Sequence, residues 1–440
     1  MLRIFLIPAS MFRHGSRIVF RSSYLRRMLW PTLVAASVAL AACVSKAPDP
    51  RLAREAGRAA DRVADSYVLI PDRLFDGRNM REGHGVAVSG GRIVAVGPVD
   101  ALPAEGRLPL PGATLLPGFI DLHGHLAAQD VSFSTVLRHG ITSVRDLGGP
   151  PKPVSGGDGS LRHLSAGPII TAPGGYPIPV FGQGKSGAGH GHGAAALAVE
   201  VADAAQARRV VDHIVEAGAS VIKIALEPGG SAGAPWSMHE AGTLPPWPLP
   251  SAEVVKTVVA QAHGRGRIVS AHLSGVAGAR LALDAGVDEW AHMPCDALPE
   301  ALIARAVEAR VRIVGTLDTL SHCSGAFANA RRFVEKGGTL LYGTDMAHTE
   351  LPWGIDSREL ELMVHVGHGQ LSAEKVLSAA TALAGEQAGL APLGQLVPGA
   401  PADMIAVRGN PLHRLKVLEY PELVISGGKF VVRDLIEQER

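Results

Sequence analysis

Six residues with metal-binding or catalytic side chains each lie at the end of a short apolar run that is typical of a β-strand. They are His123, His125, Lys223, His272, His292 and Asp345. In a parallel (β/α)8 barrel the carboxyl ends of all strands meet at one face, so residues far apart in the sequence converge there. Four imidazoles, a lysine and a carboxylate at that face predict a hydrolytic site with two metal ions.

The spacing of the first two histidines and the chemistry of the lysine both bear on metal binding. Only Gly124 separates His123 from His125, and side chains at positions i and i+2 of a strand project to the same side, so both imidazoles can reach one ion. An ammonium group has no lone pair, so Lys223 can act as a ligand only after it adds carbon dioxide and becomes an anionic carbamate. The alternative is that Lys223 lines the pocket or pairs with Glu227.

The elements that must position these residues follow a βα pattern, in which apolar runs alternate with amphipathic segments. Strands are predicted at 118–122, 142–145, 169–171, 221–224, 268–271, 289–291, 313–316 and 340–343. A helix is predicted over 208–217, where apolar residues recur on one face, and two more begin at Ser251 and Ser372, which can cap free N–H groups. We therefore predict a barrel over 117–394.

Both ends of this barrel region are flanked by sequence rich in β-strand formers. Ser89-Gly90-Gly91 and Ser426-Gly427-Gly428 each lie between two apolar runs, which predicts a hairpin in each region because glycine accepts the positive φ of tight turns. The predicted fold class is α/β, a (β/α)8 TIM-like barrel with a small β-sandwich domain built from both ends of the chain. The sandwich is predicted to comprise residues 66–116 and 395–435.

The amino-terminal segment has the pattern of an export signal. Arg26 and Arg27 precede an apolar stretch over 28–42 that is too short to span a membrane as a helix and fits a secretory signal peptide. Leu40-Ala41-Ala42-Cys43 resembles a bacterial lipobox, so we expect 1–42 to be a lipoprotein-type signal peptide and Cys43 to carry the lipid. Residues 43–65 are then a tether.

The residue that follows Cys43 bears on where a lipidated protein would be located. Residue 44 is Val and not Asp, which by the same resemblance favours a lipid-anchored protein at the outer membrane facing the periplasm. The alternative is an ordinary signal peptide and a soluble periplasmic or secreted protein.

Charge and cysteine content limit the partners further. The formal charge of +1, from 42 Lys and Arg against 41 Asp and Glu, provides no field for nucleic acid or acidic lipid. We expect a small-molecule or dipeptide substrate and no nucleic acid. We expect membrane contact through the lipid anchor only, and we leave a homo-oligomer open.

Cys295 and Cys323 follow neighbouring predicted strands and can form a disulfide. The alternative is that they are two buried, inert thiols.

The sequences around the six residues resemble the motifs of the amidohydrolase superfamily. The resemblance covers residues 66–435. The matching motifs are Pro117-Gly118-Phe119-Ile120-Asp121-Leu122-His123-Gly124-His125, Gly140-Ile141-Thr142-Ser143-Val144-Arg145-Asp146, Val221-Ile222-Lys223-Ile224, Ala271-His272, Trp290-Ala291-His292, Gly343-Thr344-Asp345 and Pro398-Gly399-Ala400-Pro401-Ala402-Asp403.

The resemblance implies a role for each ligand. His123 and His125 would hold the more buried metal, and His272 and His292 the more exposed one. Lys223, as a carbamate, would bridge two divalent ions, for which zinc is expected. Asp345 would bind the buried metal and act as the acid and base while a hydroxide that bridges the metals attacks an amide carbonyl.

Within the superfamily, the motifs look like those of Xaa-Pro dipeptidases and related amidases. That branch commonly places a Tyr-Ser pair before the fifth helix to assist the carbonyl, whereas this chain has Pro248-Leu249-Pro250-Ser251. His190 and His192, in a loop where relatives often carry Gly-His-Gly, are the predicted replacements, with solvated loop histidines as the alternative. His322 can also face the pocket. Arg145 and Asp146 can anchor a substrate carboxylate or form a buried pair.

The function favoured is therefore a metal-dependent hydrolase that cleaves amide bonds of small dipeptides or N-acyl amino acids. A lactone, cyclic amide or organophosphate ester hydrolase on the same scaffold is an alternative, as is a mononuclear amidase similar to imidazolonepropionases. A non-catalytic binding module is a third alternative. All six ligand positions are filled here, and a degenerate site would rarely keep both Lys223 and Asp345.

Overall fold

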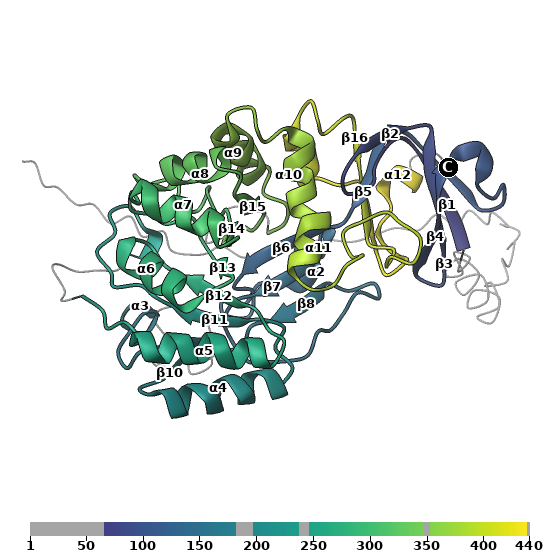
Figure 1. Cartoon of the computed structure of the whole chain (residues 1–440). Helices are drawn as coiled ribbons and strands as arrows, with labels where there is room; N and C mark the ends of the chain where they lie inside the picture. Colours follow the sequence, from purple (N-terminus) through teal and green to yellow (C-terminus); the bar gives the residue numbers. More distant parts are fainter. Residues whose placement is uncertain (1–65, 182–196, 237–245, 347–352, 438–440) are drawn as a thin grey trace, which may run out of the picture. The chain divides into compact units, whose positions relative to one another are not determined.

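The computed structural model describes residues 66–181, 197–236, 246–346 and 353–437 (Figure 1). The predicted signal peptide, the lipidation residue Cys43 and the tether lie outside the described residues, and so do His190 and His192. In the described ranges, no helix combines the length and the apolar character that crossing a membrane requires.

Parallel strands connected by helices form the larger part of the fold. The strands are β6 (Phe119–Gly124), β7 (Ile141–Asp146), β8 (Arg162–Ser165), β9 (Ile169–Thr171), β10 (Ala198–Glu200), β11 (Ile222–Ala225), β12 (Val269–His272), β13 (Glu289–Trp290), β14 (Arg312–Val314) and β15 (Thr339–Leu341). They pair as two parallel sheets, with the orders β6-β7-β8 and β10-β9-β11-β12-β13-β14-β15.

Helices follow most of these strands in the chain, and Figure 1 shows α5 to α8 outside β12 to β14. The helices of the barrel region are α2 (Phe133–Arg138), α3 (Ile178–Phe181), α4 (Ala204–Glu216), α5 (Ala252–Gly264), α6 (Val276–Ala285), α7 (Glu300–Glu308), α8 (Ala326–Glu335), α9 (Ser357–Gly367), α10 (Ala373–Ala380) and α11 (Ala382–Gln387). The predicted helix starts are confirmed, because the hydroxyls of Ser251 and Ser372 accept from the backbone N–H groups of Val254 and Lys375.

Hydrogen bonds join the edges of the two parallel sheets. Leu122 N, on β6, donates to Tyr342 O after β15 at 3.4 Å, and Ser220 N, before β11, donates to Ser165 O on β8 at 2.8 Å. The strands therefore follow one another around a barrel, and all eight predicted strands are confirmed. The third strand position of the barrel is divided between β8, which pairs with β7, and β9, which pairs with β11.

The small β domain is built from both ends of the described chain, as predicted. Its strands are β1 (Ser66–Phe75), β2 (Met80–Glu82), β3 (His84–Ser89), β4 (Arg92–Pro98), β5 (Arg107–Pro117), β16 (Met404–Arg408), β17 (Leu423–Ser426) and β18 (Lys429–Val432). Short helices η1 (Val99–Ala101), η4 (Leu415–Glu419) and α12 (Asp434–Glu437) accompany them.

These strands are hydrogen-bonded as one sheet of order β18-β17-β16-β5-β1-β3-β4, with β2 on β1. The sheet curls round its own apolar core, because Ile93 N donates to Ala400 O at 2.9 Å and Gly399 N to Ile93 O at 2.8 Å. Both predicted hairpins are present. Gly427 is required in the second turn, since its φ is 54° and a Cβ there would lie 2.0 Å from Gly157 O.

Asp403 connects this sheet to the barrel through hydrogen bonds. Its backbone oxygen accepts from Gly118 N at 2.9 Å, between β5 and β6, and its carboxylate accepts from Arg162 Nη2 on β8 at 2.9 Å. The same carboxylate accepts from Gly427 N at 2.6 Å. A residue near the end of the chain thus fixes the strand that delivers the first two histidines.

Candidate metal centre

The first and last barrel strands are linked by a buried carboxylate. Asp121 Oδ1 on β6 accepts from His123 N at 2.9 Å, and Asp121 Oδ2 accepts from the Thr344 hydroxyl at 2.7 Å. The next residue, Asp345, donates its own N–H to His123 O at 2.8 Å. Asp345 adopts a φ of 43°, a conformation that costs free energy for a residue with a side chain and that often marks a functional site.

Three of the predicted ligands converge on one point. His123 Nε2 and His125 Nε2 lie 3.2 Å apart, and each lies 3.4 Å from Asp345 Oδ1. Ligand atoms at about 2.0–2.2 Å from a tetrahedral ion are themselves separated by roughly 3.3–3.6 Å. The three atoms thus have the spacing that a common metal ion imposes.

The other two histidines meet the second oxygen of the same carboxylate. His292 Nδ1 lies 3.5 Å from Asp345 Oδ2, and His292 Nε2 lies 2.8 Å from His272 Nδ1. His123, His292 and Asp345 offer ligand atoms that all lie within 4.8 Å of one another. The structure therefore brings the four predicted imidazoles and Asp345 together in one continuous set of donors.

The imidazoles are held in the form that binds metal. His123 Nδ1 lies 2.7 Å from the backbone oxygen of Ala291, and because a carbonyl can only accept, Nδ1 donates and Nε2 is left as the ligand atom. Burial is the largest cause that lowers the pKa of all four histidines, for His125 to about 4. Neutral imidazole has the lone pair that a metal needs.

Lys223 lies on β11, and its side chain is buried. Its Nζ has no hydrogen-bond partner in the described part of the chain. Burial lowers the pKa of Lys223 to about 7, although Asp345 and Glu289 oppose this, and burial raises the pKa of Asp345 to about 7 against the charge of Lys223. An unpartnered buried amine beside converging imidazoles fits a site that holds a divalent ion.

Aromatic residues that no sequence motif indicated cover His272. The ring of Tyr176 stacks on the His272 imidazole, with centroids 4.3 Å apart and planes inclined by 12°, and Trp236 meets the same imidazole edge-on at 4.5 Å. Burial, followed by the charges of Asp345 and Glu227, raises the pKa of Tyr176 well above its usual value. The available signal was the position of Tyr176 in a Gly-rich loop directly after the third strand.

Three further residues named from the sequence make contacts other than those with the predicted ligands. His322 is exposed to solvent and is not among the converging residues. Arg145 and Asp146 do not pair with each other. Arg145 Nη2 lies 2.5 Å from Glu289 Oε1 in the barrel interior, and Asp146 Oδ2 lies 3.2 Å from His163 Nε2. Both side chains of this dipeptide are buried, and each is paired with another residue of the chain.

The model of the amidohydrolase family matches residues 114–436 of the chain, which includes every barrel strand and every predicted ligand. The chain belongs to the amidohydrolase family. It is therefore a hydrolase, and divalent metals are general in this family, which agrees with the convergence of His123, His292 and Asp345.

The amidohydrolase is similar in sequence and in fold to a fungal ochratoxinase. It is 28% identical over 334 residues to ochratoxinase of Aspergillus niger, a match that spans 67% of this chain and 66% of the fungal protein. The crystal structure of A. niger ochratoxinase has a TM-score of 0.66 at 23% identity, covering 85% of this chain and 98% of that one.

Two further solved structures share the fold. A Xaa-Pro dipeptidase with bound methionine in the active site has a TM-score of 0.66 at 22% identity, covering 83% of this amidohydrolase and 99% of that chain. A putative prolidase from Bifidobacterium longum has a TM-score of 0.65 at 25% identity, covering 84% and 95%.

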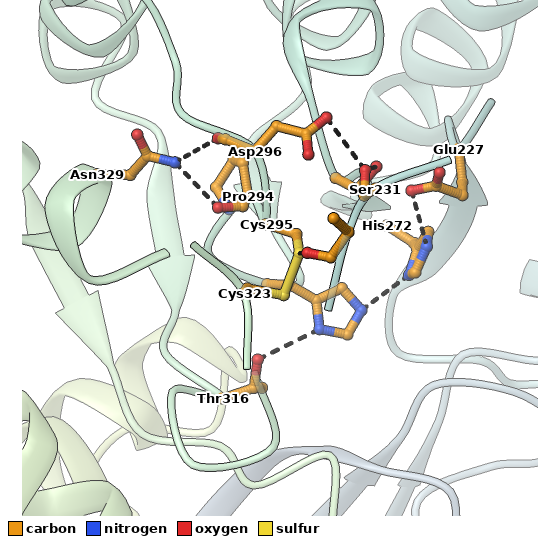
Figure 2. The surroundings of a disulfide bond; sticks show 12 residues. Glu227, Ser231, His272, Pro294, Cys295, Asp296, Thr316, Cys323 and Asn329 are labelled. Atoms are coloured by element: carbon orange, nitrogen blue, oxygen red, sulfur yellow. Dashed lines mark hydrogen bonds and ion pairs between the residues drawn. A yellow bond between two sulfur atoms is a disulfide. The ribbon is translucent and has the colours of Figure 1, made fainter. Parts of the chain in front are cut away.

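A disulfide lies near the metal centre. Cys295 after β13 and Cys323 after β14 are bonded, with their Cα atoms 4.8 Å apart. Figure 2 shows this bond together with His272 and Glu227, whose Nε2 and Oε2 atoms are 3.6 Å apart. The segment that carries Cys323 is also held by Gly325 N, which donates to Cys295 O at 2.8 Å. The loops after the sixth and seventh barrel strands are thus joined covalently.

Replacing both cysteines, Cys295→Ala with Cys323→Ala, is expected to lower the free energy of unfolding by about 3 kcal/mol, because the bond closes a loop across a sequence separation of 28. Urea denaturation with and without a reductant measures this. The wild-type protein should lose stability on reduction, and the double variant should not respond. Two titratable thiols from these positions in the folded, non-reduced protein would show that the bond is absent.

Proposed function

We propose that this amidohydrolase cleaves amide bonds of small dipeptides or N-acyl amino acids with the help of two divalent metal ions, with zinc as the native metal. The observation that carries the proposal is the position of Asp345. Its Oδ1 lies 3.4 Å from His123 and His125, while its Oδ2 lies 3.5 Å from His292. One carboxylate therefore contacts both histidine groups.

The donor set divides between two ions. His123, His125 and Asp345 would hold one, and His272 and His292 the other, with Lys223 supplying anionic oxygens to both as a carbamate. Divalent ions held in this way supply an acidified water and a positive charge that polarises a carbonyl oxygen. The unpartnered Nζ of Lys223 supports this assignment, because a buried amine without a partner is costly unless it is modified or neutral.

Asp345 has the position required for proton transfer. It lies among the ligands with 16% of its side chain exposed, so it can reach both the attacking water and the substrate. A carboxylate there can accept the proton of the water and then deliver it to the departing nitrogen, and one group suffices because it titrates between the two steps.

The substrate class is supported by the relatives. Ochratoxinase of A. niger matches in sequence, and the fold is shared with a Xaa-Pro dipeptidase and with a prolidase complexed with N-methylphosphonate-L-proline. A dipeptide and an N-acyl amino acid present the same amide between an acyl group and an amino acid.

A panel of substrates tests the proposal. The zinc-reconstituted protein should be assayed against Xaa-Pro and other dipeptides, N-acyl amino acids, lactones and phosphotriesters, with the metal content measured on the same sample. We expect amide turnover at about two equivalents of metal. Turnover confined to lactones or phosphotriesters would reject the substrate class, and amide turnover by protein without bound metal would reject the metal mechanism.

We further propose that the enzyme is anchored through lipidated Cys43 at the outer membrane and faces the periplasm. The lipobox-like Leu40-Ala41-Ala42-Cys43 and Val44 support this location. Cell fractionation of the wild-type protein and of Cys43→Ser tests it, since only the wild-type protein should sediment with membranes.

A further inference from the structure

An aromatic wall covers the His272 side of the metal centre. Tyr176 lies between two rings: it stacks on His272 at 4.3 Å on one side and on Trp247 on the other, with centroids 5.6 Å apart and planes inclined by 28°. Trp236 meets both Tyr176, at 6.0 Å, and His272, at 4.5 Å. The phenol ring is thereby confined in two directions and can move little.

The backbone that carries Tyr176 is also fixed. Gly175 N donates to Ala172 O at 2.8 Å, and Ile178 N donates to Gly175 O at 3.1 Å. A Cβ at Gly175 would lie 2.5 Å from the Thr171 hydroxyl and 2.7 Å from Pro248 O, so the loop is pressed against the end of β9 and the segment before α5. Tyr176 is therefore held directly after the third barrel strand, at the catalytic face of the barrel.

The hydroxyl of Tyr176 is not used by the fold. It makes no hydrogen bond to another residue in the described ranges, and only 9% of Tyr176 is exposed. The imidazole that its ring covers, His272, lies 3.6 Å from Glu227, and the neighbouring His292 lies 3.5 Å from Asp345. A hydroxyl without a protein partner at the edge of a reaction site can gain a partner when substrate binds.

The segment in which the Xaa-Pro dipeptidase branch commonly carries a Tyr-Ser pair offers no free side-chain donor here. The Ser251 hydroxyl accepts from Val254 N at 3.2 Å and caps α5, and the three residues before it are Pro248, Leu249 and Pro250, which offer no side-chain donor. Within the described residues, Tyr176 is the hydroxyl donor stacked on His272, while Trp236, whose Nε1 also lacks a partner, meets His272 edge-on and His292 at a tilt.

We propose that Tyr176 is a catalytic residue whose hydroxyl donates a hydrogen bond to the carbonyl oxygen of the scissile amide on the His272 side of the site. This inference rests on the proposed amidase function. A phenol remains protonated at neutral pH and has no competing partner here, so it can donate to the oxygen as negative charge develops on it. Because the ring is already confined, little entropy is lost when that bond forms.

The substitution Tyr176→Phe keeps both stacking contacts and removes the hydroxyl alone. We expect kcat/KM for the best amide substrate to fall roughly 10²- to 10³-fold, as for the loss of one oxyanion donor. A tetrahedral phosphonate analogue of that substrate should bind weaker by a similar factor in calorimetry. The carboxylate product should bind within about threefold of its wild-type affinity, because it develops no oxyanion.

Bound metal and the urea midpoint of Tyr176→Phe should match the wild-type values, and Tyr420→Phe, at a tyrosine that is 61% exposed, is the matched control. Unchanged kcat/KM and unchanged phosphonate affinity would overturn the inference. A loss of bound metal in Tyr176→Phe would overturn it as well, because the hydroxyl would then support the ligands. Failure of the wild-type protein to cleave any amide would instead reject the proposed function, a result that does not depend on Tyr176.

Discussion

Asp345→Asn is expected to retain the two proposed metal ions and to lower kcat roughly 10³- to 10⁴-fold, the scale of a lost acid and base. The amide oxygen of asparagine can still ligate, but the side chain can no longer accept and return a proton at neutral pH. The measurement pairs steady-state kinetics on the best amide substrate with the metal content of the same sample. Asp284→Asn, at an exposed carboxylate on α6, is the control.

The position of Asp345 among the imidazoles makes the loss of kcat in Asp345→Asn the largest expected effect. Asp345 contacts three of the four imidazoles. Its N–H donates to His123 O, and the preceding residue, Thr344, donates to Asp121 through its N–H and its hydroxyl. No other carboxylate in the described part of the chain contacts His123 or His125 within 4 Å. Turnover close to the wild-type rate would show that Asp345 does not transfer the proton.

Lys223→Ala should lower bound metal from about two equivalents toward one and reduce kcat/KM roughly 10²-fold or more, because the variant loses the only predicted bridge and a charge that balances the ions. Metal analysis after exhaustive dialysis measures the first effect. Lys256→Ala, at an exposed lysine on α5, should change neither quantity. A Lys223→Ala protein that still binds two equivalents would reject the bridging role.

The barrel could be predicted because local sequence patterns specify its strands. Each of the eight strands is a short apolar run, and the topology of a parallel barrel then requires that residues at the carboxyl ends meet. The positions of His123, His272 and Asp345 at strand ends were therefore sufficient to predict that they converge. The strand β8 was missed because Arg162, His163 and Ser165 make it polar, although tertiary contacts bury three of its four residues.

The contacts that the site residues make depend on tertiary packing, which no local sequence pattern specifies. Arg145 faces Glu289 across the barrel interior instead of its neighbour Asp146, since consecutive residues of a strand point to opposite sides. Tyr176 stacks on His272 because of the path of a loop whose Gly and Pro content indicates only irregular structure. Residues in such loops can be named as candidates from the sequence, but their contacts require coordinates.

The bond from Gly118 to Asp403 has a consequence for biosynthesis. Strand β5 pairs with β1 on one side and with β16 on the other, so the region that leads into the first histidine pair gains its second neighbour only after the ribosome has made residues beyond 400. Contacts of such long sequence separation form late and slow the folding rate. A nascent chain that stops before β16 would expose β5 as an open strand edge, which favours aggregation over maturation of the enzyme.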